Sequence, residues 1–293
     1  MTMEEHEVAT QDGRVLKVLE DGDRVGRPVL VHNGMPSSRL LFASDVRSAQ
    51  RLGIRLISYD RPGYGGSTRR PGRSVADCAE DVRAIATALD IDRLAVWGIS
   101  GGGPHAIACA AVLPDLVMSV AVLASVAPWG AEGLDYFAGT GEWNVEQVSL
   151  MLEDPAAARA KCEDNRVQML TQTLPELMEF LKTLLAPVDA AALTGELGQY
   201  VIDATRSGMA TSSDGWWDDG LAILEPWGFE FGSIRIPVLL LHGRHDRFVP
   251  FAHGEWLART IPGVEARLTD DDGHLTLTTH HLDEVHSWLL ERM

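Results

Sequence analysis

One serine stands in a sequence context that favours nucleophilic chemistry. The run Gly98-Ile99-Ser100-Gly101-Gly102 begins within the last two residues of the apolar segment Arg93–Ile99 and precedes the small-residue segment Gly103–Leu113. These segments predict a strand and a helix joined by a sharp turn. Small neighbours let strand and helix approach each other, and the turn exposes the serine oxygen. The pattern predicts that Ser100 is a nucleophile and that the N–H of Gly101 faces a developing oxyanion.

A serine hydroxyl is a weak nucleophile and needs a base, which an acid must orient. After a nucleophile turn of this kind, the acid and then the base are expected later in the chain. Asp246 follows the predicted strand Ile236–His242, and His274 follows the predicted strand Val264–Leu268. Loops at the carboxyl ends of parallel strands meet at one sheet edge. We therefore expect Ser100, Asp246 and His274 to form a catalytic triad.

The remaining histidines and neighbouring acids have simpler interpretations. Three histidines belong to a predicted surface helix and are expected to be solvated, namely His280, His281 and His286. His105 is expected to pack near the site, and His242 to be a core histidine at a strand end. His245 could be mistaken for the base, but its neighbour Asp246 fits the position of the acid better. Three acids are too close to His274 in sequence and are expected to form a solvated acidic turn, namely Asp270, Asp271 and Asp272.

A second oxyanion donor is expected from the loop that follows the strand Pro28–His32. Within this loop, Gly34 permits an unusual backbone turn, and Pro36 has no N–H to donate. The main-chain N–H of Met35 is therefore the candidate donor. The alternative is an ordinary strand-to-helix loop without a role in catalysis.

The elements that position these residues alternate between strand and helix patterns. The alternation stops at residue 130 and resumes after residue 233, and the segment between them shows helical patterns only, such as Leu174–Leu185 and Ala190–Ile202. Alternation of this kind predicts an α/β fold with a mostly parallel, doubly wound sheet. We expect an α/β core formed by residues 1–129 and 234–293, with residues 130–233 inserted as a helical cap.

Composition narrows the possible partners. The chain has 293 residues and a net charge of −17, which disfavours nucleic acids and anionic membranes as partners. The segment 130–233 holds 18 acidic and 5 basic residues. Three dispersed cysteines predict neither a disulfide framework nor a zinc site, and an acidic N-terminus without an apolar run is no signal peptide. We expect a cytoplasmic protein that acts on a small molecule without a metal or other cofactor; the composition indicates no oligomeric state.

Four stretches of the chain together resemble the α/β-hydrolase fold family of serine hydrolases. They are His32-Asn33-Gly34-Met35-Pro36, Asp60-Arg61-Pro62-Gly63-Tyr64-Gly65-Gly66-Ser67, the turn at Ser100, and Asp246 with His274. The resemblance spans the core from about residue 8 to 290 and implies an α/β-hydrolase fold whose helical cap covers the site. It also implies that residues 60–67 form a structural loop near the site. Epoxide hydrolases and haloalkane dehalogenases of this fold carry Asp at the nucleophile position, so Ser100 argues against both.

The resemblance implies a serine hydrolase, and we expect it to cleave a carboxylic ester of a small neutral or apolar substrate. Gly34 and three of the insertion's tryptophans are candidates to contact the substrate, namely Trp143, Trp216 and Trp217. The alternative for the tryptophans is that they pack the cap onto the core.

Other activities remain open on the same scaffold. One is a proline iminopeptidase-like aminopeptidase, because relatives of that kind bind a free amino terminus with cap carboxylates. Five glutamates are available for that role or form a solvated helix face: Glu142, Glu146, Glu153, Glu176 and Glu179. A lyase, a peroxidase-like enzyme and a non-catalytic ligand receptor are the further alternatives.

Overall fold

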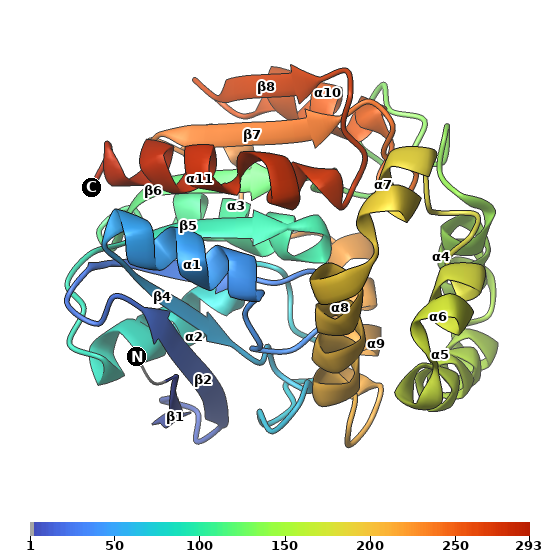
Figure 1. Cartoon of the computed structure of the whole chain (residues 1–293), viewed down its shortest axis with the longest axis horizontal. Helices are drawn as coiled ribbons and strands as arrows, with labels where there is room; N and C mark the ends of the chain where they lie inside the picture. Colours follow the sequence, from blue (N-terminus) through green and yellow to red (C-terminus); the bar gives the residue numbers. More distant parts are fainter. Residues whose placement is uncertain (1–2) are drawn as a thin grey trace.

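A computed structural model describes residues 3–293, which are built around one eight-stranded sheet (Figure 1). The strand order is β1-β2-β4-β3-β5-β6-β7-β8. β2 runs antiparallel to both of its neighbours, whereas all pairings from β4 to β8 are parallel. The strands are β1 (Glu4–Ala9), β2 (Val15–Gly22), β3 (Arg27–His32), β4 (Ile54–Tyr59), β5 (Leu94–Ile99), β6 (Val117–Leu123), β7 (Val238–Gly243) and β8 (Glu265–Thr269). The predicted mostly parallel sheet is confirmed.

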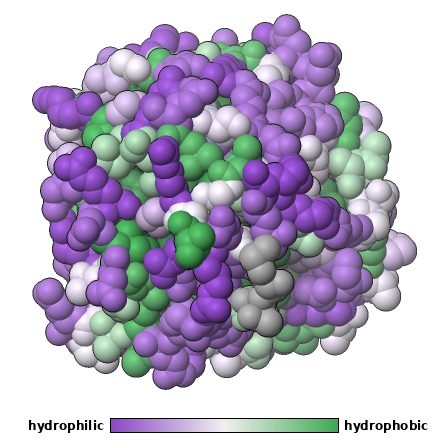
Figure 2. All heavy atoms as spheres, turned by 60° about the vertical axis from the view of Figure 1, so that its left-hand side comes forward, coloured by the Kyte–Doolittle hydropathy of each residue, from purple (hydrophilic) through white to green (hydrophobic). Residues whose placement is uncertain are grey.

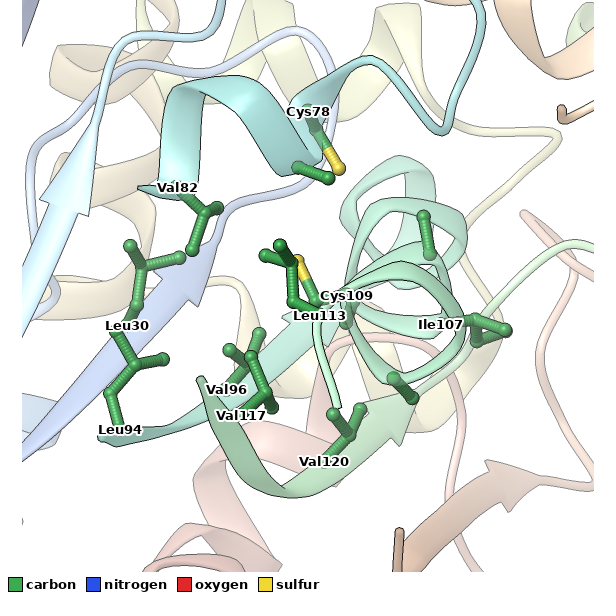
Figure 3. Packing of buried hydrophobic residues seen from close by; sticks show 14 of the residues in the cluster. Leu30, Cys78, Val82, Leu94, Val96, Ile107, Cys109, Leu113, Val117 and Val120 are labelled. Carbon is green, nitrogen blue, oxygen red and sulfur yellow. The ribbon is translucent and has the colours of Figure 1, made fainter. Parts of the chain in front are cut away.

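Helices cover both faces of this sheet, which explains why the central strands are almost continuously apolar. One face packs against α1 (Ala43–Leu52) and α11 (Thr276–Leu290). The other packs against α2 (Cys78–Ala88), α3 (Gly103–Val112) and α10 (Phe251–Thr260). Figure 3 shows part of this second core, where Cys78 and Cys109 lie among aliphatic side chains of α2, α3 and the strands. The two cores make the sheet a rigid platform for the loops at its carboxyl edge.

A layer of helices lies beyond the carboxyl ends of the parallel strands (Figure 1). This helical layer, as we call it below, comprises α4 (Glu142–Glu153), α5 (Pro155–Thr171), α6 (Leu174–Phe180), α7 (Pro187–Ala192), α8 (Gly195–Gly208) and α9 (Asp214–Leu224). It falls within residues 130–233, where the sequence predicts helices and no strand. The division of the chain at residues 129 and 233 into core and cap remains a prediction.

Several predicted elements differ from the structure at their ends. The sequence also predicts a helix capped by Ser74, but α2 begins at Cys78, because the hydroxyl and N–H of Ser74 both donate to the Asp77 carboxylate in a local turn. The predicted helix over 190–202 is two helices, α7 and α8, separated at Leu193 and Thr194. β1 was not predicted, and it pairs with β2 at the sheet edge.

Polar side chains cover most of the face shown in Figure 2, and apolar residues appear between them. None of the helices within residues 3–293 combines the length and apolar character needed to cross a membrane.

Candidate active site

Ser100 occupies a strained turn between β5 and α3. Its φ of 55° lies in the left-handed region, and a short 3₁₀ helix over residues 100–102 leads into α3. Close packing explains the glycines around it, because a Cβ on Gly98 would lie 2.5 Å from the Gly102 carbonyl oxygen. A Cβ on Gly102 would lie only 2.0 Å from the carbonyl oxygen of His32. Such strain in a non-glycine residue costs about 1–3 kcal/mol and persists at functional sites. Ser100 therefore has the geometry of a nucleophile turn.

His274 and Asp246 form a buried pair in the loops that follow β8 and β7. The Nδ1 atom of His274 lies 2.7 Å from Oδ2 of Asp246. The other carboxylate oxygen accepts the N–H groups of Phe248 and Val249, both at 2.8 Å, which fixes its orientation. Burial alone would lower the pKa of His274, but the charge of Asp246 and its hydrogen bond outweigh burial and raise it. With Nδ1 engaged, Nε2 remains as the working nitrogen of the ring.

The loop after β3 runs beside the nucleophile turn. A Cβ on Gly34 would lie 3.5 Å from Cβ of Ser100, and a Cβ on Gly101 would lie 2.5 Å from Cγ of Met35. The Gly34 carbonyl accepts a hydrogen bond from Arg61 at 3.1 Å. Because C=O and N–H point in opposite directions across a trans peptide, the N–H of Met35 is directed away from Arg61. The loop therefore places Met35 next to Gly101, and the role of its N–H as an oxyanion donor remains a prediction.

Asn33 and Arg61 stabilise that loop from behind. The side-chain amide of Asn33 donates to the carbonyls of Ser38 and Leu40, and the main-chain carbonyl of Asn33 accepts from Arg61 at 2.5 Å. Arg61 belongs to the 60–67 loop, in agreement with the structural role that the resemblance implies. Replacing the side chain of Asn33 would free two carbonyls from their partner.

Arg61 is in turn paired with Asp219 of α9, a residue that the sequence analysis missed. Asp219 accepts hydrogen bonds from Arg61 at 2.7 Å and from Arg73 at 2.5 Å. Burial would raise the pKa of Asp219, but the two guanidinium groups lower it, so the carboxylate stays charged. His105 lies 3.6 Å from Asp219 and bonds the carbonyl of Gly101. Burial lowers the pKa of His105 to about 3, so this ring is neutral and packs beneath the site.

A cavity of about 330 Å³ lies between the carboxyl edge of the sheet and the helical layer. Its lining includes all of the predicted site residues except Asp246, which stands behind His274: Ser100, His274, Met35, Gly101, Gly34, Trp143, Trp216 and Trp217. Trp143 and Trp216 stack with their ring centroids 6.2 Å apart. The tryptophans thus line the cavity, whereas the fourth of this segment, Trp227, is buried in the core.

The five glutamates considered for amine binding do not reach this cavity. All five are exposed on the outside of the helical layer, namely Glu142, Glu146, Glu153, Glu176 and Glu179. Glu176 instead accepts the N–H and hydroxyl of Thr173 as a helix cap. The carboxyl group that the cavity does contain is Asp45, in the first turn of α1. The only sequence signal for Asp45 was its position as an acidic residue in the first turn of a helix. Such acidic residues are common in helices that carry no functional site.

Two expectations about polar side chains were wrong. His286 is fully buried rather than solvated, because α11 packs against α1 and its Nδ1 lies 2.9 Å from the Ser48 hydroxyl. Asp272 is also buried and contacts His280 and His281, at 2.7 and 2.8 Å. His245 is exposed, and His242 is a core histidine whose Nε2 bonds the Val249 carbonyl.

His32, Cys78 and Cys109 form the group most suited to hold a metal within residues 3–293. One ligand atom from each lies within 4.8 Å of the others in the core. Burial raises the pKa of the Cys78 thiol well above its usual value, which keeps the proton on the sulfur. We interpret the group as neutral packing; the cysteines Cys78, Cys109 and Cys162 are free thiols.

Asp189 ties α7 of the helical layer to the loop that carries His274. Its buried carboxylate accepts the N–H groups of His274 at 2.9 Å, Leu275 at 2.7 Å and Thr276 at 3.3 Å. These are the free donors at the start of α11, so a residue distant in sequence caps this helix.

We expect Asp189→Ala to lower the free energy of unfolding by about 1–3 kcal/mol, because it leaves buried N–H groups unsatisfied. Urea unfolding followed by circular dichroism measures the change. Asp154→Ala is the matched control, since it removes an exposed cap from α5 and should cost less. An equal loss in the free energy of unfolding for the two variants would contradict the prediction that the buried Asp189 carboxylate contributes more to stability than an exposed helix cap.

Comparisons with known proteins agree with this geometry. Residues 27–280 match the family model described as alpha/beta hydrolase fold. The chain is 28% identical over 273 residues to the AB hydrolase superfamily protein YisY of Bacillus subtilis, covering 92% of each chain. It is 25% identical over 271 residues to a non-heme chloroperoxidase of Streptomyces lividans, covering 84% of this chain and 83% of that protein. The crystal structure of the esterase RhEst1 from Rhodococcus superposes with a TM-score of 0.71 at 21% identity, covering 99% of each chain. With its sheet, nucleophile turn and matched family model in agreement, the chain belongs to the α/β-hydrolase fold family.

Proposed function

We propose that this protein is a serine hydrolase that cleaves a carboxylic ester of a small molecule with an apolar body. The observation that carries the proposal is that Ser100, at a strained turn, and the His274–Asp246 pair meet at one cavity. A serine at such a turn and an oriented imidazole that line one cavity are the groups required for acyl transfer.

The reaction follows from these groups. Nε2 of His274 takes the proton of the Ser100 hydroxyl, and the serine oxygen attacks the ester carbonyl. The N–H groups of Met35 and Gly101 stabilise the oxyanion of the tetrahedral intermediate. His274 then gives its proton to the departing alcohol, which leaves an acyl group on Ser100. Water, deprotonated by the same imidazole, releases the acid and restores the serine.

The lining of the cavity supports an apolar substrate body. Aromatic and aliphatic side chains dominate it, among them Trp143, Trp216 and Met151. The aminopeptidase alternative loses its proposed anchor, because the five glutamates lie outside the cavity. A peroxidase-like activity uses the same serine and is an outcome that substrate assays separate from ester hydrolysis.

Labelling with a fluorophosphonate, followed by intact-mass measurement, tests the proposal. We expect one adduct on the wild-type protein and none on Ser100→Ala, because only an activated serine attacks the phosphorus centre at a useful rate. Ser125→Ala is the matched control: Ser125 is buried beside Gly103 of the nucleophile turn but does not line the cavity. It should label as the wild type does. Folded wild-type protein without an adduct would refute an activated Ser100 and favour a ligand-binding protein.

A further inference from the structure

Asp45 stands apart from the other buried acids of this protein. Eight aspartates are buried within residues 3–293, and seven of them contact a cation, a histidine or backbone N–H groups: Asp60, Asp81, Asp189, Asp218, Asp219, Asp246 and Asp272. Asp45 is 6% exposed, and its carboxyl oxygens accept no hydrogen bond from the described residues. A buried carboxyl without a partner is costly, so its retention calls for a reason.

That unpaired carboxyl lines the cavity of the candidate active site. Asp45 is the one acidic residue in the lining described above, and the same lining contains no lysine or arginine. Its end of the cavity is apolar, where Phe42 packs with Leu193 and Leu197 of the helical layer. The Tyr200 hydroxyl lines the same cavity but donates to the Leu40 carbonyl. A ligand in the cavity is therefore the partner within reach of Asp45.

Charge indicates the kind of group that this ligand carries. The lining contains no lysine or arginine that could pair with an anion, and the net charge of −17 repels one. Arg47, the nearest cation on α1, is exposed and bonds Glu196 through both of its terminal nitrogens. An ammonium group forms charge-assisted hydrogen bonds with a carboxylate, and this interaction is strong in a desolvated site.

We propose that Asp45 binds a protonated amine on the substrate, at the end of the cavity formed by α1 and α8. This inference rests on the proposed function and adds a substrate class to it, namely amine-bearing esters. In the empty cavity, burial raises the pKa of Asp45 to about 8, so the carboxyl is mostly neutral at pH 7. When the ammonium binds, the carboxyl releases its proton to the solvent and forms the ion pair. The amine keeps its own proton throughout.

Three six-carbon ligands test the inference by titration calorimetry: 1-aminohexane, 1-hexanol and hexanoate. On the wild type at pH 7 we expect the amine to bind about 10- to 100-fold more tightly than the alcohol, since hydrogen bonds to charged groups are the stronger ones. Asp45→Asn should abolish that preference and leave the affinity for the alcohol unchanged. Asp203→Asn is the matched control, because it removes one exposed charge from α8 outside the cavity.

Proton release gives a second and independent readout. Repeating the amine titration in buffers of different ionisation enthalpy should show nearly one proton released at pH 6.5 and almost none above pH 9. The affinity should rise with pH up to about 8 and then level off, because the raised pKa of Asp45 sets the cost of deprotonation. The titratable groups nearby remain in Asp45→Asn, so the difference between the proteins isolates Asp45; these groups are His274, Tyr200, Arg47 and Glu196.

Equal affinity for amine and alcohol, or an amine preference that survives in Asp45→Asn, would overturn the inference. If the variant does not fold, the wild type still tests the inference, because amine binding without proton release at pH 6.5 would overturn it. The ligands are not hydrolysed, so these results do not depend on catalysis. Fluorophosphonate labelling of Ser100 tests the proposed function separately. The two experiments therefore show which of the two proposals has failed.

Discussion

Ser100→Ala is expected to lower the turnover of an activated ester such as p-nitrophenyl butyrate by roughly 10⁶-fold, as happens when the nucleophile of a triad is removed. The loss arises because the methyl group cannot form the acyl-enzyme, so only the oxyanion donors and substrate binding continue to act. Turnover measured with the purified variant at saturating ester gives the size of the effect.

Binding should survive this substitution. Ser100 has a φ of 55°, a conformation that alanine tolerates no better than serine does, and the removed oxygen is small. We expect the affinity for 1-hexanol to change by less than about threefold, because the apolar lining that binds the chain is untouched. Turnover that remains within about tenfold of the wild type would show that another residue is the nucleophile.

Asp246→Asn is expected to lower kcat by roughly 10⁴-fold. The amide can donate a hydrogen bond to Nδ1 of His274, which favours the tautomer that carries its proton on Nε2. That tautomer cannot accept the proton of Ser100. Steady-state kinetics with the same ester measure the effect, and KM should change little because Asp246 does not line the cavity.

The pH profile of Asp246→Asn distinguishes this role from a structural one. In the wild type, the raised pKa of His274 means that activity is lost as pH falls through a value above 6.5. Removing the charge of Asp246 takes away the principal cause that raises this pKa. The acid limb of the residual activity should therefore move to lower pH.

Asp272→Asn provides the matched control for this variant. Asp272 is also a buried aspartate near His274 in sequence, but its carboxylate bonds His280 and His281 of α11. We expect its kcat to stay within about threefold of the wild type. A loss comparable to that of Asp246→Asn would contradict the assignment of Asp246 as the orienting acid.

The nucleophile turn could be predicted because it is local. The glycines at positions 98, 101 and 102 lie within two residues of Ser100, and the steric demands of the turn act over that distance. Asp246 and His274 could also be predicted, although they are distant from Ser100 in sequence. The loops that follow parallel strands meet at one edge of the sheet, so the alternation of strands and helices was sufficient to predict that these residues lie at the same edge as Ser100.

Other features required knowledge of which helix faces which neighbour. Glu142 and Trp143 are adjacent in α4, yet one is exposed and the other lines the cavity. The weak apolar periodicity of α4 and α5 does not reveal the inner face, because side chains in this layer surround a cavity rather than a continuous core. For the same reason, the burial of His286 followed only from the packing of α11 against α1.

The amino-acid sequence by itself determined the sheet, the nucleophile turn and the order of the candidate triad, because strand patterns and steric limits act between near neighbours. The tertiary structure alone decided the contacts of Asp45, Asp189 and Asp219. Asp189 and Asp219 come from the helical layer and join segments between about 80 and 160 residues apart, whereas Asp45 comes from α1. The partners of Asp189 and Asp219, and the lack of a partner for Asp45, depend on how the helical layer packs on the sheet. That packing is the sum of many weak contacts between distant segments, which no local sequence pattern predicts.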